Sequence, residues 1–326
     1  MLCDLCSRDK PVIKRPKNGT MVCKSCFFAL FEAEVHETIV QNEFFFRGEK
    51  VLVAVSGGKD STVLAYVMSL LNDRHDYGIN LHLVCVDEGI KGYRDHSLET
   101  VKQNKEDYNL ELEIVSFKEL FNLTMDEVMQ KKRMGSCTYC GVFRRQALEE
   151  GARRIGATKI ITGHNADDMA ETVILNLLRG DFNRLKRCTA AKTKRNVSSE
   201  VCIEDMGKGC GCSNEQNVGS TSLVRVKPFK YIYEKEIVFY AYLKNLKYFS
   251  TECIYSPGAH REYARMFLRS LDPELIMNVI KSGEFLERSD TNSRVWNCVL
   301  CGKMTSSAAK KCKACVLLNS LQNMLN

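Results

Sequence analysis

Residues 51–64, VLVAVSGGKDSTVL, constrain the fold of this chain more than any other part of its sequence. An apolar, β-branched run ends at two adjacent glycines, and a helical pattern begins at once with Lys59. Glycines allow backbone N–H groups to close on a ligand, and the N-terminus of the helix that follows favours anionic oxygen. The segment therefore predicts a strand, a phosphate-binding loop and a helix in direct succession.

This loop is not a Walker loop, which has the form G-x-x-x-x-G-K-[ST]. Here Gly57 and Gly58 are adjacent, and Asp60 stands where the Ser or Thr would be. Two glycines alone would fit an ordinary tight turn. The full hexapeptide SGGKDS, bracketed by strand and helix, resembles instead the loop of the PP-loop pyrophosphatases, which release the two outer phosphates of ATP together. That resemblance implies adenylation rather than phosphoryl transfer.

Strand and helix patterns alternate along the rest of the chain. Such alternation predicts an α/β fold with a doubly wound parallel sheet covered by helices on both faces. The predicted strands are residues 51–55, 81–86, 112–115, 159–162 and 223–227, and the predicted helices are residues 61–71, 94–108, 142–155 and 166–179.

Three polar clusters follow predicted strands, at residues 56–61, 87–89 and 163–168. Ligands of such sheets lie outside the carboxyl ends of the strands, so one nucleotide could contact all three clusters, Asp87 included. In TGHNADDMAET the histidine and two aspartates could form a helix N-cap and a solvated first turn. Alternatively, Asp60 or Asp168 helps to hold Mg²⁺ beside the phosphates, or orients an arginine.

Cysteine pairs near both ends predict two zinc sites, each closed by four thiolates and therefore structural. In each set, two CxxC hairpins are separated by a spacer, of sixteen residues in the first set and ten in the second. The first set is Cys3, Cys6, Cys23 and Cys26, and the second is Cys298, Cys301, Cys312 and Cys315. Chance spacing or disulfide bonding are the weaker alternatives, since a cytosolic chain keeps its thiols reduced.

A central pair, Cys137 and Cys140 in GSCTYCGVFRR, has no second CxxC nearby. It could be a further pair of metal ligands or two reduced thiols packed in a turn. It could also be a redox pair or an iron–sulfur site that takes a third thiolate from elsewhere in the fold. Cys253 in FSTECIYSPG is the best candidate for that third ligand, because it lies outside both zinc modules.

The composition permits a nucleic-acid partner. The 326 residues carry a net charge of +7 and are 44% hydrophobic, which is enough for a full core with one or two small modules. No run approaches the roughly 18 apolar residues of a membrane helix, and no basic-then-apolar leader precedes Cys3, so we expect a cytoplasmic protein without membrane contact.

Basic residues around the predicted site favour RNA as that partner. Each could be a solvated helix face, but together they would form a rim suited to phosphate contacts. The principal candidates are Lys131, Lys132, Arg133, Arg144 and Arg145, with further basic residues at 153–154, 184–187 and 192–195.

Taken together, these features resemble a known family. It is the eukaryotic and archaeal branch of the PP-loop tRNA thiolases, which contains the cytoplasmic tRNA 2-thiolation proteins. The matching stretches are FEAEVHETIV, SGGKDSTVLA, VDEGIKGYRD, CTYCGVFRRQALEEGA, TGHNADDMAETV, KPFKYIYEKEIV and YFSTECIYSP, flanked by the two zinc sets. The resemblance runs from residue 3 to about residue 315. It implies ATP-dependent replacement of the C2 oxygen of wobble uridine 34 by sulfur, in the lysine, glutamine and glutamate tRNAs.

The resemblance also implies roles for individual residues. Ser56, Gly57, Gly58, Asp60 and Ser61 match the pyrophosphate loop of the family, with Lys59 stabilising the departing pyrophosphate, and Ala54 and Gly163 match positions that line the nucleotide. Cys137, Cys140 and Cys253 match three thiolates that hold a [4Fe-4S] cluster and leave one iron open for sulfide. An alternative uses two of these cysteines as a persulfide carrier and its resolving partner.

Two features depart from the family. Arg144 stands where bacterial and archaeal members of the wider group tend to have lysine. Residues 195–222 form a polar insertion containing Cys202, Cys210 and Cys212, which we interpret as a solvent-exposed loop with incidental thiols rather than a metal site.

We therefore expect three parts: an N-terminal zinc module with a helix at residues 1–46, a PP-loop catalytic domain at 47–290 and a C-terminal zinc ribbon at 291–326. The family implies a ubiquitin-related modifier as sulfur carrier and a second thiolation subunit as partners. The competing functions are a PP-loop enzyme that adenylates another tRNA base, a PP-loop amidotransferase or synthetase, and a non-catalytic zinc-finger RNA-binding subunit. The last of these would leave the SGGKDS loop without a role.

Overall fold

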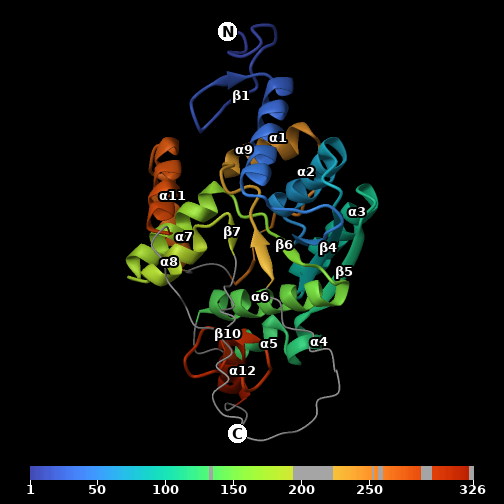
Figure 1. The fold of residues 1–326 in the computed structure, drawn as a ribbon, viewed down its shortest axis with the longest axis vertical. Helices are drawn as coiled ribbons and strands as arrows, with labels where there is room; N and C mark the ends of the chain where they lie inside the picture. Colours follow the sequence, from blue (N-terminus) through green and yellow to red (C-terminus); the bar gives the residue numbers. More distant parts are fainter. Residues whose placement is uncertain (132–134, 194–222, 252, 256–259, 288–295, 323–326) are drawn as a thin grey trace, which may run out of the picture.

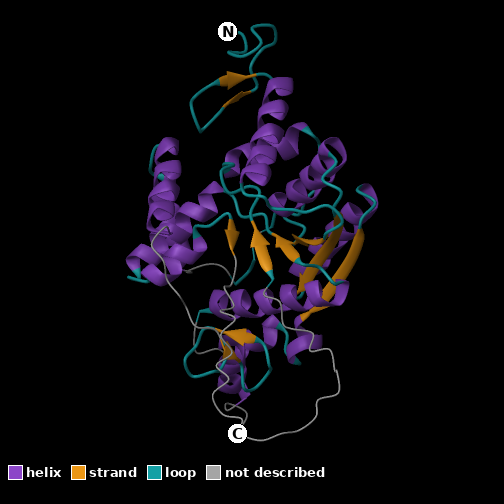
Figure 2. Ribbon diagram, viewed as in Figure 1, coloured by secondary structure: helices purple, strands orange, loops and turns teal. Residues whose placement is uncertain are grey.

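The computed structural model describes residues 1–131, 135–193, 223–251, 253–255, 260–287 and 296–322. A six-stranded sheet lies at the centre of the molecule (Figure 2). Its strands are β3 (Lys50–Val55), β4 (Asn80–Asp87), β5 (Glu111–Ser116), β6 (Lys159–Ile161), β7 (Lys192–Thr193) and β8 (Val224–Val226). Their order is β5-β4-β3-β6-β8-β7, and all neighbours are parallel except β7 and β8.

This order confirms the predicted doubly wound sheet. The chain winds outward from β3 through β4 to β5, and then returns to the other side of β3 through β6 to β8. The direction of winding therefore changes between β3 and β6, the position at which open sheets of this kind bind their ligands. The antiparallel edge strand β7 was not predicted, because two residues carry no detectable periodicity.

Helices cover both faces of the sheet because side chains of a strand alternate between its faces. Val51 and Val53 of β3 join one core, while Leu52 between them joins the other. The first core is completed by α1 (Lys24–Gln41), α2 (Lys59–His75), α3 (Tyr93–Asp107) and α9 (Glu234–Leu243). The second is completed by α4 (Phe117–Phe121), α5 (Met125–Lys131), α6 (Ser136–Ile155) and α12 (Lys313–Gln322).

The remaining helices pack against one another beside the edge of the sheet formed by β8 and β7 (Figure 1). They are α7 (Ala166–Leu178), α8 (Phe182–Cys188), α10 (His260–Arg269) and α11 (Pro273–Glu287). A third, smaller core that includes Met169, Tyr233 and Ile280 joins α7 and α11 to the segment before α9. No helix in the described part of the chain is both long and apolar enough to cross a membrane.

The terminal cysteine sets lie at opposite ends of the long axis of the molecule (Figure 1). A short antiparallel hairpin accompanies each set. The strands β1 (Ile13–Lys14) and β2 (Met21–Val22) lie between the two cysteine pairs of the first set, and β9 (Trp296–Asn297) and β10 (Met304–Thr305) flank Cys298 and Cys301 of the second. Cys23 is buried in the first core and Cys298 in the second. The two ends thus stand on opposite faces of the same sheet.

The buried guanidinium of Arg15 ties the N-terminal hairpin to the rest of the molecule. Its Nε donates to Glu236 of α9 at 2.6 Å, and its Nη atoms make a bidentate pair with Glu34 of α1 at 2.8 and 2.9 Å. Because Arg15 and Glu236 are both almost fully buried, removal of either would leave an uncompensated buried charge. These contacts hold the hairpin at one orientation.

One predicted boundary was wrong in a way that affects the site. The helix expected at residues 142–155 begins at Ser136, so Cys137 and Cys140 lie within its first two turns rather than in a turn before it. The Ser136 hydroxyl donates to the carbonyl oxygen of Tyr255 at 2.8 Å. This tertiary contact anchors the start of the helix, and local apolar periodicity cannot reveal it.

Candidate active site

The predicted phosphate loop is closed by its own hydroxyl groups. The Ser56 N–H donates to Ser61 Oγ at 3.1 Å, and Ser61 Oγ donates to the carbonyl oxygen of Gly58 at 3.0 Å. Gly57 has φ +79°, and a Cβ there would lie 2.5 Å from the backbone oxygen of Ser97 in α3. Only glycine fits this position, so the loop is held in a preformed shape at the N-terminus of α2.

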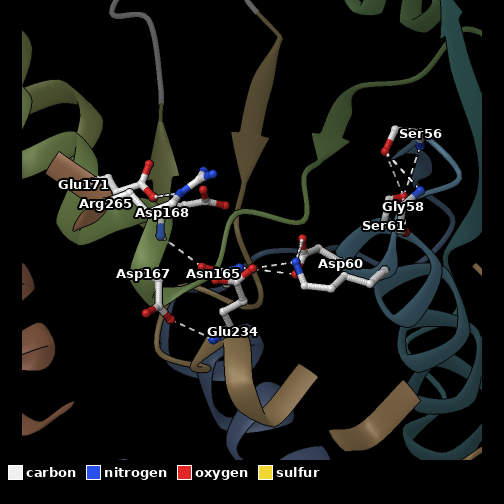
Figure 3. A network of polar contacts seen from close by, with 11 residues as sticks. Ser56, Gly58, Asp60, Ser61, Asn165, Asp167, Asp168, Glu171, Glu234 and Arg265 are labelled. Carbon is white, nitrogen blue, oxygen red and sulfur yellow. Dashed lines mark hydrogen bonds and ion pairs between the residues drawn. The ribbon is translucent and has the colours of Figure 1, made fainter. Parts of the chain in front are cut away.

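The loops after β3 and β6 meet, as the strand-end argument predicted. A Cβ at Gly163 would lie 3.3 Å from the backbone of Asp60, and the Asn165 side chain donates to Asp60 Oδ1 at 3.3 Å. Asn165 is also the N-cap of α7, because its Oδ1 accepts from the Asp168 N–H at 2.9 Å (Figure 3). Asp167 and Asp168 lie in the first turn of α7, as the N-cap and first-turn alternative predicted, but the cap itself is Asn165 and not His164.

Lys59 is held at the loop by two carboxylates. Its Nζ lies 2.6 Å from Glu234 Oε1 and 3.3 Å from Asp60 Oδ2. Burial disfavours the charge, but Asp60 and Glu234 outweigh this effect and raise the pKa of Lys59. The ammonium group is therefore charged at neutral pH and lies beside the loop.

Sequence reasoning missed Glu234, the first residue of α9. Its N–H donates to Asp167 Oδ2 at 2.7 Å, so α7 and α9 are joined at their N-terminal ends (Figure 3). Glu234 falls in the family-like stretch KPFKYIYEKEIV, which begins at the end of the strand predicted at 223–227, so that strand end is the signal that could have indicated it.

Asp60 and Asp168 form an acidic edge beside Lys59. Burial, with smaller contributions from Asp168 and Glu234, raises the pKa of Asp60, and Lys59 opposes this. The remaining predicted cluster, residues 87–89, lies at the end of the adjacent strand β4, where Asp87 Oδ1 accepts from the Gly89 N–H at 2.9 Å. Ala54 is half-buried in β3 and packs against the second core.

Two arginines that follow the Cys253 segment also reach this edge. Glu171 of α7 is buried and pairs at 2.8 Å with the Nε atoms of both Arg261 and Arg265 of α10. Arg265 lies next to Asp168 (Figure 3), and the negative charge of Asp168 contributes to raising the pKa of Arg265. The possibility that Asp168 orients an arginine is thus compatible with the structure.

His164 carries no charge at neutral pH. Desolvation lowers its pKa to about 4, and the nearby cations Lys227 and Arg261 act in the same direction. Its Nδ1 lies 2.9 Å from Thr162 Oγ1. A neutral imidazole at this position can donate or accept a hydrogen bond, but it does not contribute a positive charge to a phosphate site.

The terminal cysteine sets fit zinc. In each set the four sulfurs all lie within 4.8 Å of one another, and the sets are the two that were predicted. The Cys23 N–H lies 3.3 Å from Cys3 Sγ, and the Cys312 N–H lies 3.2 Å from Cys298 Sγ. Backbone hydrogen bonds, the largest from Cys6, lower the pKa of Cys3 to about 6, which favours the thiolate that binds metal.

The central cysteines gather around the start of α6. Cys140 and Cys253 both pack against the second core, and Cys137 is exposed. Burial raises the pKa of Cys140, and Arg144 opposes this effect while Cys253 and Cys137 reinforce it. Among the described residues, only the terminal sets have all their sulfurs within 4.8 Å of one another, and these three sulfurs are not so close. A [4Fe-4S] cluster does not require such a set, because each of its cysteines binds a different iron.

The predicted basic rim is only partly near this site. Arg144 lies in α6 one turn beyond Cys140, and its Nη2 is 3.4 Å from Cys140 Sγ. Arg153 and Arg154 lie in the last turn of the same helix, roughly 20 Å away at about 1.5 Å per residue, and they pair with glutamates. They therefore do not belong to a rim at the cysteines.

Other members of the rim are less informative. Arg145 is exposed on α6, and Lys131 is the last residue of α5. Lys132, Arg133, the insertion at 195–222 and its cysteines lie outside the described residues.

Comparison with known proteins agrees with this architecture. The PP-loop domain family matches residues 30–275. The chain is 52% identical over 327 aligned residues to cytoplasmic tRNA 2-thiolation protein 1 of Malassezia globosa, with 98% of this chain and 87% of the relative covered. It is 53% identical to the protein of the same name from Drosophila grimshawi, with 97% and 87% covered.

A solved structure is similar over nearly the whole chain. The U34-tRNA thiolase NcsA from Methanococcus maripaludis, determined with its [4Fe-4S] cluster, superposes with a TM-score of 0.76. Its sequence is 25% identical, and the match covers 99% of this chain and 96% of NcsA. The chain belongs to the cytoplasmic tRNA 2-thiolation protein 1 family of PP-loop proteins.

Proposed function

We propose that this protein is a tRNA-uridine 2-sulfurtransferase that thiolates wobble uridine 34 of the cytoplasmic lysine, glutamine and glutamate tRNAs. The observation that carries the proposal is that one chain contains both a phosphate-binding loop and a group of three cysteines. A preformed SGGKDS loop lies at the switch point of the sheet, and three cysteines gather at the start of α6. The names of the relatives and of the NcsA structure describe tRNA thiolation.

The reaction needs both parts because the C2 oxygen of uridine is a very poor leaving group. In the proposed first step this oxygen attacks the α-phosphorus of ATP, the bond to the β-phosphate breaks, and pyrophosphate leaves. The glycine loop and the N-terminus of α2 bind the outer phosphates, and Lys59 stabilises the charge that develops on them. In the second step sulfur attacks C2 and AMP leaves.

Asp60 and Asp168 are the proposed Mg²⁺ ligands beside these phosphates. Carboxylate oxygens are the ligands that Mg²⁺ prefers, and the two groups are close enough to raise the pKa of Asp60. Asp87, Ala54 and Gly163 are the proposed neighbours of the rest of the nucleotide, because they lie at the ends of β4, β3 and β6.

Cys137, Cys140 and Cys253 are the proposed sulfur-handling residues. When bound to them, a [4Fe-4S] cluster would supply an open iron at which incoming sulfide is held. The residues fit such a group, because Cys140 and Cys253 both pack against the second core, Cys137 precedes Cys140 at the start of α6, and cysteine thiolates are the ligands that such clusters take. The persulfide alternative uses the same cysteines without iron.

We further propose that the terminal sets each bind one structural zinc ion. Purified protein is expected to contain two zinc ions per chain, measured by inductively coupled plasma mass spectrometry. Cys312→Ser should remove one of them and lower the thermal unfolding temperature, because a structural zinc site contributes its binding free energy to folding. Cys188→Ser, outside both sets, is the matched control. Retention of two zinc ions in Cys312→Ser would contradict the C-terminal assignment.

The proposed partners follow from the family. We infer that tRNA is the substrate, that sulfur arrives from a thiocarboxylated ubiquitin-related modifier, and that a second thiolation subunit assembles with this chain. Lys131 to Arg133, Arg144 and Arg145 remain candidate tRNA contacts. The relatives are named as cytoplasmic proteins, and we propose the same compartment here.

The decisive experiment uses anaerobically purified protein, unmodified lysine tRNA, sulfide and ATP. We expect tRNA-dependent formation of AMP and pyrophosphate, with 2-thiouridine at position 34 detected by nucleoside and oligonucleotide mass spectrometry. Formation of ADP and phosphate would overturn adenylation. AMP and pyrophosphate formed with sulfur at another base would instead support the alternative of a different tRNA target. Binding of tRNA without turnover in any condition would favour a non-catalytic RNA-binding subunit.

A further inference from the structure

A continuous row of polar contacts joins the phosphate loop to the central cysteines. Arg94 of α3 donates through Nη1 to the carbonyl oxygen of Ser56 at 3.4 Å, and its Nε lies 3.2 Å from Glu88 Oε2. The other oxygen of Glu88 lies 2.7 Å from Nη2 of Arg144. That same nitrogen lies 3.4 Å from Cys140 Sγ. Glu88 and Arg94 have side chains only 4% exposed, so most of the row is shielded from water.

The backbone that carries the central carboxylate of this row is held in place. The carbonyl oxygen of Glu88 accepts from the Met125 N–H at 2.7 Å. The following Gly89 has φ +68°, and a Cβ there would lie 2.8 Å from the Thr124 side chain. The loop after β4 therefore has little freedom, and Glu88 points between two arginines from different helices.

Arg94 is fixed in the same way. Its Nη1 also donates to Ser97 Oγ at 3.0 Å, and its Nη2 donates to Cys85 Sγ at 2.5 Å. Burial raises the pKa of Cys85 to about 11, so this sulfur accepts as a neutral thiol and does not compete with Glu88 for the arginine as a second anion. Gly57 packs against Ser97, so the phosphate loop contacts α3, the helix that also carries Arg94.

Stability alone does not account for a buried charged row of this kind. Apolar side chains of similar volume usually replace a buried ion pair at little or no cost in folding free energy. What apolar packing cannot do is hold the guanidinium of Arg144, half of whose side chain is exposed, in one position beside Cys140. A bidentate or charge-assisted contact gives that directional restraint.

We propose that Glu88 is a positioning residue that holds Arg144 against Cys140 and, through Arg94, links the position of this arginine to the state of the phosphate loop. The proposal deepens, and rests on, the thiolation function inferred above. Nucleotide bound in the preformed loop would further restrain the Ser56 carbonyl and, through Arg94 and Glu88, the start of α6. By linkage, such coupling between two sites acts in both directions.

Hydrogen–deuterium exchange tests the link without using turnover. Binding of α,β-methylene-ATP to the full-length protein is expected to slow exchange at residues 54–62, where it binds, and also at residues 137–145. In Glu88→Gln the first effect should persist and the second should fall by about fivefold or more. Glu88→Asp, which keeps the charge but shortens the reach, is the second variant if Glu88→Gln does not fold.

Glu49→Gln is the matched control. Glu49 also forms a buried pair, with Lys159 at 2.6 Å, but it lies just before β3 at the opposite end of the strand from the phosphate loop. It should leave the exchange of residues 137–145 unchanged. A wild-type protein that binds α,β-methylene-ATP with no change at residues 137–145 would overturn the proposal, as would a change that Glu88→Gln leaves intact.

Single-turnover thiolation distinguishes a positioning role from a merely structural one. Glu88→Gln and Arg144→Ala should each slow the formation of 2-thiouridine by about 10- to 100-fold, and the double variant should be no slower than the slower single variant. Strictly additive losses would mean that Glu88 does not act through Arg144. If the wild type shows the exchange coupling but makes no 2-thiouridine, the proposed function fails while the link between the sites stands.

Discussion

Cys253→Ser is expected to abolish 2-thiouridine in bulk tRNA of cells whose only copy of this protein carries the change. Serine keeps the size of the side chain but cannot act as a soft thiolate ligand or carry a persulfide. The residue is half-buried beside Cys140, and the Tyr255 carbonyl two residues on accepts from Ser136 at the start of α6. The segment is therefore held at the cysteine pair by contacts that serine would not disturb.

Nucleoside mass spectrometry of the tRNA provides the measurement, with protein abundance and zinc content determined in the same cells. Cys188→Ser is the matched control, because Cys188 is also half-buried but bonds to Asn176 in the α7–α8 region. Unchanged thiolation in Cys253→Ser would mean that the three-cysteine site is wrongly assigned. Iron analysis of the anaerobically purified wild type would then distinguish sulfur chemistry at Cys137 and Cys140 alone from the absence of sulfur chemistry in this protein. Iron absent from folded, zinc-loaded wild-type protein would contradict the cluster in any case.

Lys59→Ala should lower the rate of AMP formation by about 10²- to 10³-fold, equivalent to roughly 3–4 kcal/mol of transition-state stabilisation. The physical reason is that the positive charge lies at the loop where the leaving pyrophosphate gains negative charge. The effect should appear in single-turnover kinetics with tRNA and ATP at saturation. A change confined to the KM for ATP would show that Lys59 contributes only to ground-state binding.

Stability should be little affected by this change. Lys59 is paired with Asp60 and Glu234, whose side chains are 29% and 36% exposed, so water can solvate them when the ammonium group is removed. Lys235→Ala, at the adjacent exposed position of α9, controls for the loss of one positive charge in this region. A Lys59→Ala protein with the wild-type rate of AMP formation would exclude Lys59 from the chemistry.

The fold class and the two terminal cysteine sets could be predicted from short stretches of sequence because their signals are local. Apolar β-branched runs followed by glycine and a helical pattern define a strand, loop and helix within fourteen residues. Each terminal CxxC brings two sulfurs close together by local spacing alone, and two such pairs supply the four ligands of one tetrahedral site. The parallel arrangement then brings residues 56–61 and 163–168 together, since carboxyl ends of neighbouring strands meet at one edge.

The partners of these residues depend on contacts between distant segments. Glu234 lies 175 positions from Lys59, yet the two form an ion pair at 2.6 Å. Glu171 holds two arginines of α10, and Glu88 lies between Arg94 and Arg144. Glu88 falls in the polar cluster predicted at 87–89, but nothing in the sequence indicates which arginines it contacts. Charge pairing selects a partner by position in space, and sequence distance carries no information about it.

The start of α6 shows the same division. A central CxxC followed by a helix was visible in the sequence, but the helix begins before the pair and not after it. Local periodicity locates a helix by the apolar residues it buries, whereas its first turn here is set by the hydrogen bond from Ser136 to the Cys253 segment. Short-range chemistry therefore specified which residues carry function, and long-range packing alone specified how far apart and at what angle they act.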